Sequence, residues 1–282
     1  MTAFDLHFSY SGGYPPSEAS LALASAGTAE MFLGSSAFLP GEELECAGWF
    51  AGAVPAEITA ALSRLLADPS VADQLFRLQA APAGKLPMDA PVRILRLHLA
   101  DQDIKIDLPA SGGDSWMAAL DDLLIRAMTA LRRQPRQALS LQASLRREDA
   151  ALLPAFQLTG LGAQAPSILL YDPSPPAQVC VASFALESRI EFPGGGVAWN
   201  PQTMLQVPPG HWLGLIEQGS LPVQTRLAAQ HSLQLPLPSL PQPANPSGLY
   251  FSGTLSLWLV DAQNRRCRVS LQTPRQPLEM IV

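Results

Sequence analysis

Residues 139–149 read LSLQASLRRED, and they mark a change in the composition of the chain. Residues 1–150 hold 30 charged residues and 10 prolines, whereas residues 151–282 hold 12 charged residues, no lysine and 17 prolines. Helical periodicity is clear before this stretch and absent after it. We therefore predict an α+β domain over 1–150, with a mainly antiparallel sheet and two or three helices, followed by an all-β, sandwich-like domain over 151–282.

Before this stretch, short strands alternate with amphipathic helices. Pro55 suits the first turn of a helix, and Asp68-Pro69 ends it because the residue before a proline leaves the helical region. Ser70 and Asp73 resemble a capping box for a second short helix to about residue 79. The expected long helix covers 115–134, and the expected strands cover 4–8, 19–24, 29–33, 92–99, 103–108 and 139–145. This order predicts helices packed on one face of an antiparallel sheet.

After this stretch, strand-sized apolar runs recur at intervals typical of a β-sandwich or barrel. The expected strands cover 155–158, 167–171, 178–186, 189–192, 203–207, 212–217, 223–235, 250–260 and 266–271. The last two form a hairpin across Asp261–Asn264. Five prolines between 236 and 248 exclude a central strand there and predict an extended surface segment.

Charge and composition limit the classes of function. The formal net charge of −6 falls entirely in residues 1–150, and no long basic cluster occurs, so we expect no nucleic-acid partner. No apolar run reaches the roughly 18 residues of a membrane helix, so we expect no membrane insertion. The first residues lack the pattern of a signal peptide, which favours a cytoplasmic protein. Cys46, Cys180 and Cys267 are too few and too scattered for a disulfide framework.

The most conspicuous local sequence is FPGGGVAWNP at 192–201, followed by PPGHW at 208–212. Its glycines are typical of a tight loop between strands, although they also permit close approach of a ligand. The candidate binding residues are Trp199, Asn200, His211, Trp212, Arg189 and Glu217. No phosphate loop, paired metal-ligand spacing or hydrolase motif occurs, so we expect no metal and no cofactor.

Two functions remain open from the sequence. The first is a non-catalytic binding or assembly component, including an accessory protein of a secretion or surface apparatus. Its charge-poor β half would contact a protein partner or a second copy of the chain. The alternative is an enzyme or small-molecule binder, with carbohydrate as the first class to test. Its site would lie at the domain junction or around Gly194–Trp212.

Overall fold

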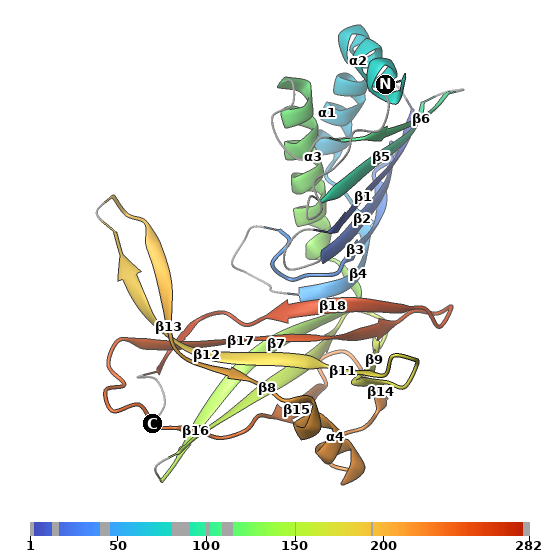
Figure 1. Cartoon of the computed structure of the whole chain (residues 1–282). Helices are drawn as coiled ribbons and strands as arrows, with labels where there is room; N and C mark the ends of the chain where they lie inside the picture. The colour runs from blue at the N-terminus through green and yellow to red at the C-terminus, as the bar shows by residue number, and fades with distance from the viewer. Residues whose placement is uncertain are drawn as a thin grey trace. The chain divides into compact units, whose positions relative to one another are not determined.

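The computed structural model describes residues 3–12, 17–39, 46–80, 91–99, 102–108, 115–149, 151–192 and 194–278. These residues form mostly antiparallel sheets with four helices (Figure 1). The chain forms two compact units: unit 1 holds residues 1–41 and 48–136, and unit 2 holds residues 42–47 and 137–282. The division into two domains at residue 150 stays a prediction. In the structure, the residues on both sides of that position belong to one hairpin, in which Glu148 pairs with Ala151.

Unit 1 contains an antiparallel sheet in the order β4-β3-β2-β1-β5-β6. Its strands are β1 (Phe4–Gly12), β2 (Ser17–Ala24), β3 (Thr28–Leu33), β4 (Cys46–Ala53), β5 (Val92–Leu99) and β6 (Gln102–Asp107). In β1, Leu6 is buried and its neighbours Asp5 and His7 are exposed, as the twofold period of a strand requires. The strands predicted over 19–24 and 29–33 pair as a hairpin, and so do those predicted over 92–99 and 103–108.

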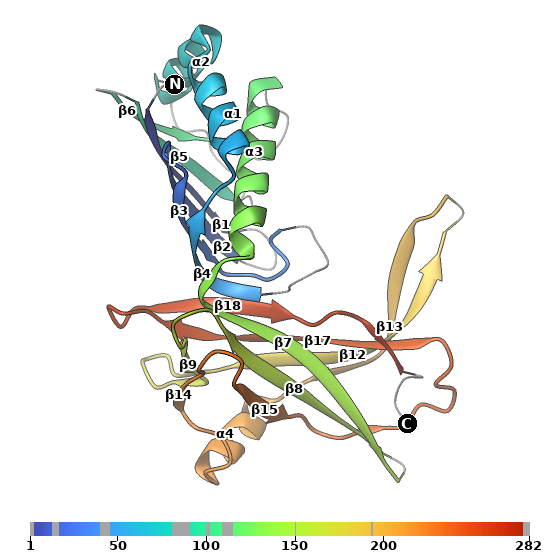
Figure 2. The same cartoon turned by 180° about the vertical axis from the view of Figure 1, so that it is seen from behind.

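Three helices cover one face of this sheet (Figures 1 and 2). They are α1 (Ala56–Leu66), α2 (Pro69–Ala80) and α3 (Ser115–Arg132). The long helix predicted over 115–134 is confirmed as α3, and its apolar residues Leu120, Leu124 and Leu131 recur at helical spacing and are buried. The predicted capping box at Ser70 is wrong, because the carboxylate of Asp68 accepts bonds from the Ser70 amide at 2.9 Å and the Ser70 hydroxyl at 2.7 Å. Asp68 therefore caps α2.

Unit 2 contains two main groups of antiparallel strands. The first has the order β15-β8-β7, with β16 also on β8: β7 (Pro135–Glu148), β8 (Ala151–Leu161), β15 (Ser232–Pro236) and β16 (Leu240–Pro241). The second has the order β13-β12-β17-β9-β14: β9 (Ser167–Leu169), β12 (Val181–Glu191), β13 (Val197–Gln206), β14 (Gln224–Arg226) and β17 (Leu249–Val260). Two further strands pair with β17, namely β18 (Arg266–Gln272) and β19 (Gln276–Pro277). A separate two-stranded sheet pairs β10 (Tyr171–Asp172) with β11 (Gln178–Val179).

The two groups of strands share an apolar core. The rings of Phe156 in β8 and Phe184 in β12 are both fully buried and lie 6.4 Å apart. Phe251 in β17 stacks on Phe184 at 5.9 Å. A side chain on Gly253 would begin 2.3 Å from the Phe156 ring, so glycine at this position lets the ring approach the backbone of β17. The predicted hairpin of β17 with β18 is confirmed.

Some predicted strands of the second half differ from the structure. The strand predicted over 223–235 is divided into β14 and β15, which pair with different neighbours. Residues 212–217, also predicted as a strand, lie in a helix, α4 (Pro209–Glu217), so the second half is not all β. Pro209 stands in the first turn, where the missing amide hydrogen costs no helical bond. Trp212 is fully buried and anchors the helix. The nine residues of α4 are too few, and too uniformly apolar, to show a helical period in the sequence.

Candidate functional site

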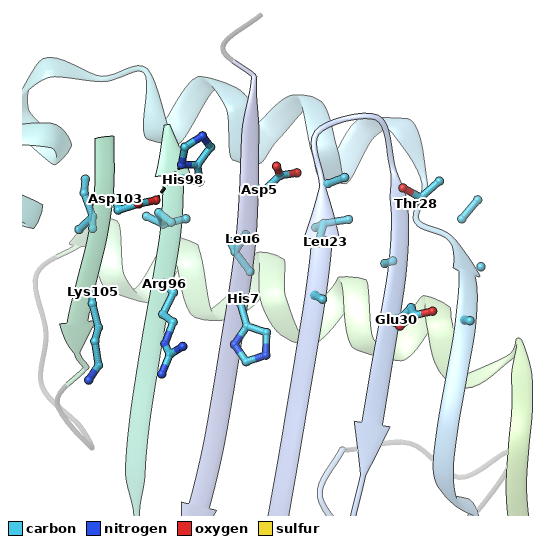
Figure 3. Close-up of a pocket in the computed structure, with 18 of the residues that line it drawn as sticks. Asp5, Leu6, His7, Leu23, Thr28, Glu30, Arg96, His98, Asp103 and Lys105 are labelled. Carbon is cyan, nitrogen blue, oxygen red and sulfur yellow. Dashed lines mark hydrogen bonds and ion pairs between the residues drawn. The ribbon is translucent and has the colours of Figure 1, made fainter. Parts of the chain in front are cut away.

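The face of the unit 1 sheet opposite the helices carries a hollow of about 1060 Å³ (Figure 3). All six strands line it, and Gln79 of α2 reaches its margin. Small side chains on β2 and β4 form part of its floor: Ala22, Ala24, Ala51 and Ala53. Longer polar side chains from the neighbouring strands surround this floor, which makes the face concave.

A row of basic side chains crosses three strands of the hollow. Lys105 of β6 pairs with Arg96 of β5, and Arg96 pairs with His7 of β1. Residues directly opposite each other on adjacent antiparallel strands point to the same face, with Cβ atoms about 5 Å apart. Figure 3 shows the three side chains side by side in front of the sheet. We refer to Lys105, Arg96 and His7 as the basic row.

A second row beside it contains two carboxylates and a histidine. The Nδ1 atom of His98 lies 2.7 Å from the Asp103 carboxylate, and Asp5 stands opposite His98 in the neighbouring strand. Across the hollow, Glu30 forms an ion pair with Arg136 at 3.2 Å. In contrast, neither Arg96 nor Lys105 forms an ion pair with any residue in the described part of the chain. Within the described residues, the hollow therefore has two cationic side chains without an ion-pair partner, beside two carboxylates, Asp103 and Glu30, that have one.

The sequence did not point to this hollow. His7 is far from Arg96 and Lys105 in the chain, and only the placement of β1 next to β5 joins them. Part of the basic row could be predicted from the hairpin of β5 and β6, because the pairing of these strands places Arg96 opposite Lys105. Within the described ranges, no three histidine, cysteine or carboxylate side chains are grouped so as to hold a metal ion.

The residues that the sequence singled out fall in two places within unit 2. Arg189 of β12 pairs with Trp199 of β13, and Asn200 follows as an exposed residue. His211, Trp212 and Glu217 lie on α4. Figures 1 and 2 both show α4 well apart from the ends of β12 and β13. The structure thus brings together the first three candidate residues, but not all six.

The three candidate residues on α4 have either contacts within unit 2 or an exposed surface position. The Nε2 atom of His211 lies 2.8 Å from the carbonyl oxygen of Pro236 and donates to it, since a carbonyl only accepts. Trp212 is fully buried and packs edge-on against the His211 ring at 5.3 Å. Glu217 is exposed at the last residue of the helix. These contacts fix α4 on unit 2.

Trp199 belongs to a cluster that the sequence did not indicate. The guanidinium of Arg275 lies 4.7 Å from the centre of the Trp199 ring, and the ring of Tyr250 meets Trp199 edge-on at 5.0 Å. Arg275 also donates from Nε to the carboxylate of Glu187 at 2.8 Å. The Ser252 hydroxyl donates to the same carboxylate at 2.9 Å. We call these five residues the clamp.

The clamp lies where a two-stranded ribbon leaves the sheet. The pairing of β12 with β17 ends at Ser188, whereas its pairing with β13 continues to Glu191 and Val197. Gly194 and Gly195 have positive φ of 112° and 85° in the turn, a conformation that favours glycine. We call residues 188–200 the ribbon. Figure 1 shows it projecting from the strands of unit 2.

Comparisons with known proteins do not assign the chain to a family. No protein-family model matches it, and no curated protein matches its sequence. Among solved structures, one similar chain is a Bordetella pertussis protein solved under the provisional name ApaA. The match has 11% sequence identity, covers 50% of this chain and 98% of that one, and has a TM-score of 0.24. At this TM-score the likeness carries no argument. Within the described residues, no helix has both the length and the apolar character needed to cross a membrane.

Proposed function

We propose that the protein is a non-catalytic binding component, that unit 2 is a β-sandwich, and that the ribbon contacts a protein partner. One observation carries this proposal. The described residues include eight large apolar side chains that are exposed, and five of them lie on β12, β13 or their turn: Val181, Ile190, Phe192, Val197 and Met204. Three of the five, Ile190, Phe192 and Val197, lie within the ribbon, and exposed apolar side chains gathered in one region are typical of sites that contact another protein.

The arrangement of the ribbon supports contact with another chain. Ile190 and Phe192 are two residues apart, so they share one face, and their side chains are 40% and 53% exposed. The strand β13 stands at the end of the strand order, and no strand of the described residues pairs with its outer side. Such an edge accepts an added strand: main-chain hydrogen bonds give the pairing its affinity, and the side chains beside the edge select which strand binds. The partner we expect therefore presents an apolar strand.

The clamp supports the same interpretation. Glu187, Trp199 and Arg275 fix both strands of the ribbon where they leave the sheet. A segment that is ordered before binding loses less conformational freedom when the complex forms. The contacts of the clamp therefore favour a ribbon that is held ready for a partner.

The alternative of an enzyme or small-molecule binder around Gly194–Trp212 has less support. The nitrogen of His211 that faces Pro236 is occupied by a backbone bond, and Trp212 offers no accessible ring face. Trp199 has Arg275 over its ring, which leaves less of the ring for a sugar to stack on. The other version of this alternative, a ligand site at the domain junction, stays a prediction.

The proposal is tested by photo-crosslinking from the ribbon. A photoreactive phenylalanine analogue replaces Phe192 in the full chain, and the crosslinked species are compared with those from the same analogue at Phe76. Phe76 is a matched control, because it is 46% exposed but lies on α2 of unit 1. We expect one discrete crosslinked product from position 192 and none of that mass from position 76.

Two further experiments test whether the crosslink is specific and identify the partner that it captures. Ile190→Ser should abolish the product from position 192 and leave the unfolding temperature unchanged. Sedimentation of the purified chain shows whether the product is a second copy or a different protein. A product that persists in Ile190→Ser, or that forms equally from position 76, would contradict a specific ribbon interface.

A further inference from the structure

We propose that the hollow of unit 1 binds the phosphate group of a small molecule, with the basic row as its binding residues. This proposal concerns a different unit from the ribbon and does not depend on it. It starts from the arrangement of Lys105, Arg96 and His7 on one face of three adjacent strands.

The pairing of Arg96 with Lys105 opposes folding. Like charges directly opposite each other on adjacent strands repel, and neither residue has an ion-pair partner in the described part of the chain to offset this. An anion placed between the two side chains removes the repulsion and gains two charge-assisted hydrogen bonds. Binding sites commonly contain an arrangement that lowers the stability of the ligand-free protein, and binding of the ligand relieves it.

The number and geometry of the donors favour phosphate over carboxylate. A carboxylate presents two oxygens, which the planar guanidinium of Arg96 satisfies alone. A phosphate monoester presents three oxygens and up to two negative charges, which match an arginine, a lysine and a histidine placed together. The spacing of about 5 Å between neighbouring strands lets all three side chains converge on one group of this size.

The surroundings of the basic row limit the ligand to a small molecule with one phosphate. Asp5, Asp103 and Glu30 line the same hollow. These carboxylates repel a polyanion such as nucleic acid, whose phosphates would pass close to them. Next to His7 in the strand register lies the small side chain of Ala22, followed by Glu30 and then Ala51, and Thr28 also lines the hollow. The rest of the hollow fits an uncharged or hydroxyl-bearing remainder, and the volume of about 1060 Å³ is ample for one.

Binding is measured by titration calorimetry on the full chain with two probes, inorganic phosphate and glycerol 3-phosphate. Sodium chloride and acetate at matched ionic strength serve as anion controls. We expect saturable binding of both phosphates and none of chloride or acetate. Arg96→Gln and Lys105→Gln should each weaken binding about tenfold or more, because each removes a charge-assisted hydrogen bond. Arg126→Gln on α3 is the matched control and should leave binding unchanged, since Arg126 is an exposed arginine outside the hollow.

The design also separates a soluble phosphate from a phosphate on a lipid. Vesicles with and without phosphatidic acid are pelleted in the presence of the protein. Pelleting with phosphatidic acid vesicles, without binding of either soluble phosphate, would overturn the proposal. So would equal binding of acetate, or phosphate binding that survives both Arg96→Gln and Lys105→Gln. Unfolding curves of each variant show that a loss of binding is not a loss of the fold.

Discussion

Arg275 forms an ion pair with Glu187 across 2.8 Å, and the carboxylate of Glu187 is almost entirely removed from solvent. The guanidinium of Arg275 also lies over the ring of Trp199, so this one side chain contacts both Glu187 and Trp199. The pair connects the segment after β18 with the strand that forms one side of the ribbon. It joins residues that are 88 positions apart in the chain.

Arg275→Ala should lower the free energy of unfolding by about 2 kcal/mol, below the roughly 3–5 kcal/mol of a fully buried pair, since the Arg275 side chain is partly exposed. The cost arises because Glu187 keeps its burial but loses its cationic partner. Urea unfolding followed by tryptophan fluorescence measures it, and the Trp199 signal should change with the loss of the cation above its ring.

Arg189→Ala is the matched control for that substitution. Arg189 also pairs with a glutamate, Glu191 at 3.1 Å, but both side chains are exposed. We expect a loss below about 0.5 kcal/mol, as for other surface pairs. Equal losses in the two variants would show that the clamp contributes no more than an ordinary surface contact.

The elements that the sequence predicted well are those whose signal is local. The helical spacing in α3 and the strict alternation in β6 each repeat within one segment, so the period alone identifies them. The hairpin of β17 and β18 adds a turn between two such runs. By contrast, α4 is short and apolar around most of its circumference, so Trp212–Glu217 resembles a buried strand.

Neither candidate site could be read from one segment. The sequence pointed to Trp199 because tryptophan beside three glycines is unusual, yet the partner that defines its environment, Arg275, lies in a distant segment. The basic row likewise needs the strand order β1-β5-β6, which puts the first strand of the chain next to the fifth. Long-range strand order is set by the packing of the whole sheet, and no local pattern encodes it.

Gly52 illustrates a second long-range constraint, which yields a double-mutant prediction. A Cβ atom on Gly52 would begin 1.8 Å from the Oε1 atom of Gln134. The Gln134 side chain accepts from the Ala53 amide at 3.0 Å and donates to the Ala53 carbonyl at 2.9 Å, as a neighbouring strand would. Gly52→Ala should displace this side chain and cost about 1–2 kcal/mol, the loss of two hydrogen bonds.

The same substitution in a Gln134→Ala background should cost much less, because the clash with the side-chain amide is removed and only the Cβ atom of residue 134 remains close, at 3.3 Å. Thermal unfolding of the two single variants and the double variant gives the coupling energy. If Gly52→Ala costs the same in both backgrounds, the close approach of Gln134 is not the reason for glycine at position 52.

Lys105→Gln should leave the stability of the protein unchanged, or raise it by up to about 0.5 kcal/mol, when no phosphate is present. The reason is the loss of repulsion with Arg96 across the strand pair. Added phosphate should raise the unfolding temperature of the unsubstituted protein more than that of the variant, since stabilisation by a ligand grows with its affinity for the folded state. A loss above about 1 kcal/mol in phosphate-free buffer would mean instead that Lys105 stabilises the sheet.

The thiol of Cys180 should make stability depend on alkaline pH. Burial raises its pKa from 9.0 to about 12, so the unfolded state ionises first as the pH rises. The unfolded state then binds fewer protons than the folded state, and the free energy of unfolding falls with rising pH between 9 and 12. This single group contributes a slope of up to about 1.4 kcal/mol per pH unit within that window.

Urea unfolding at several pH values, for the unsubstituted protein and for Cys180→Ala, isolates this contribution, because every other titrating group is common to both. The variant should lose less stability between pH 9 and 12, while the difference between the two proteins stays constant below pH 8. Alkylation gives an independent measurement: in native protein at pH 8 a thiol reagent should modify Cys180 only after urea is added, since the buried thiol has almost no thiolate form. Parallel pH curves for the two proteins, or rapid modification of native Cys180, would contradict the burial of this thiol.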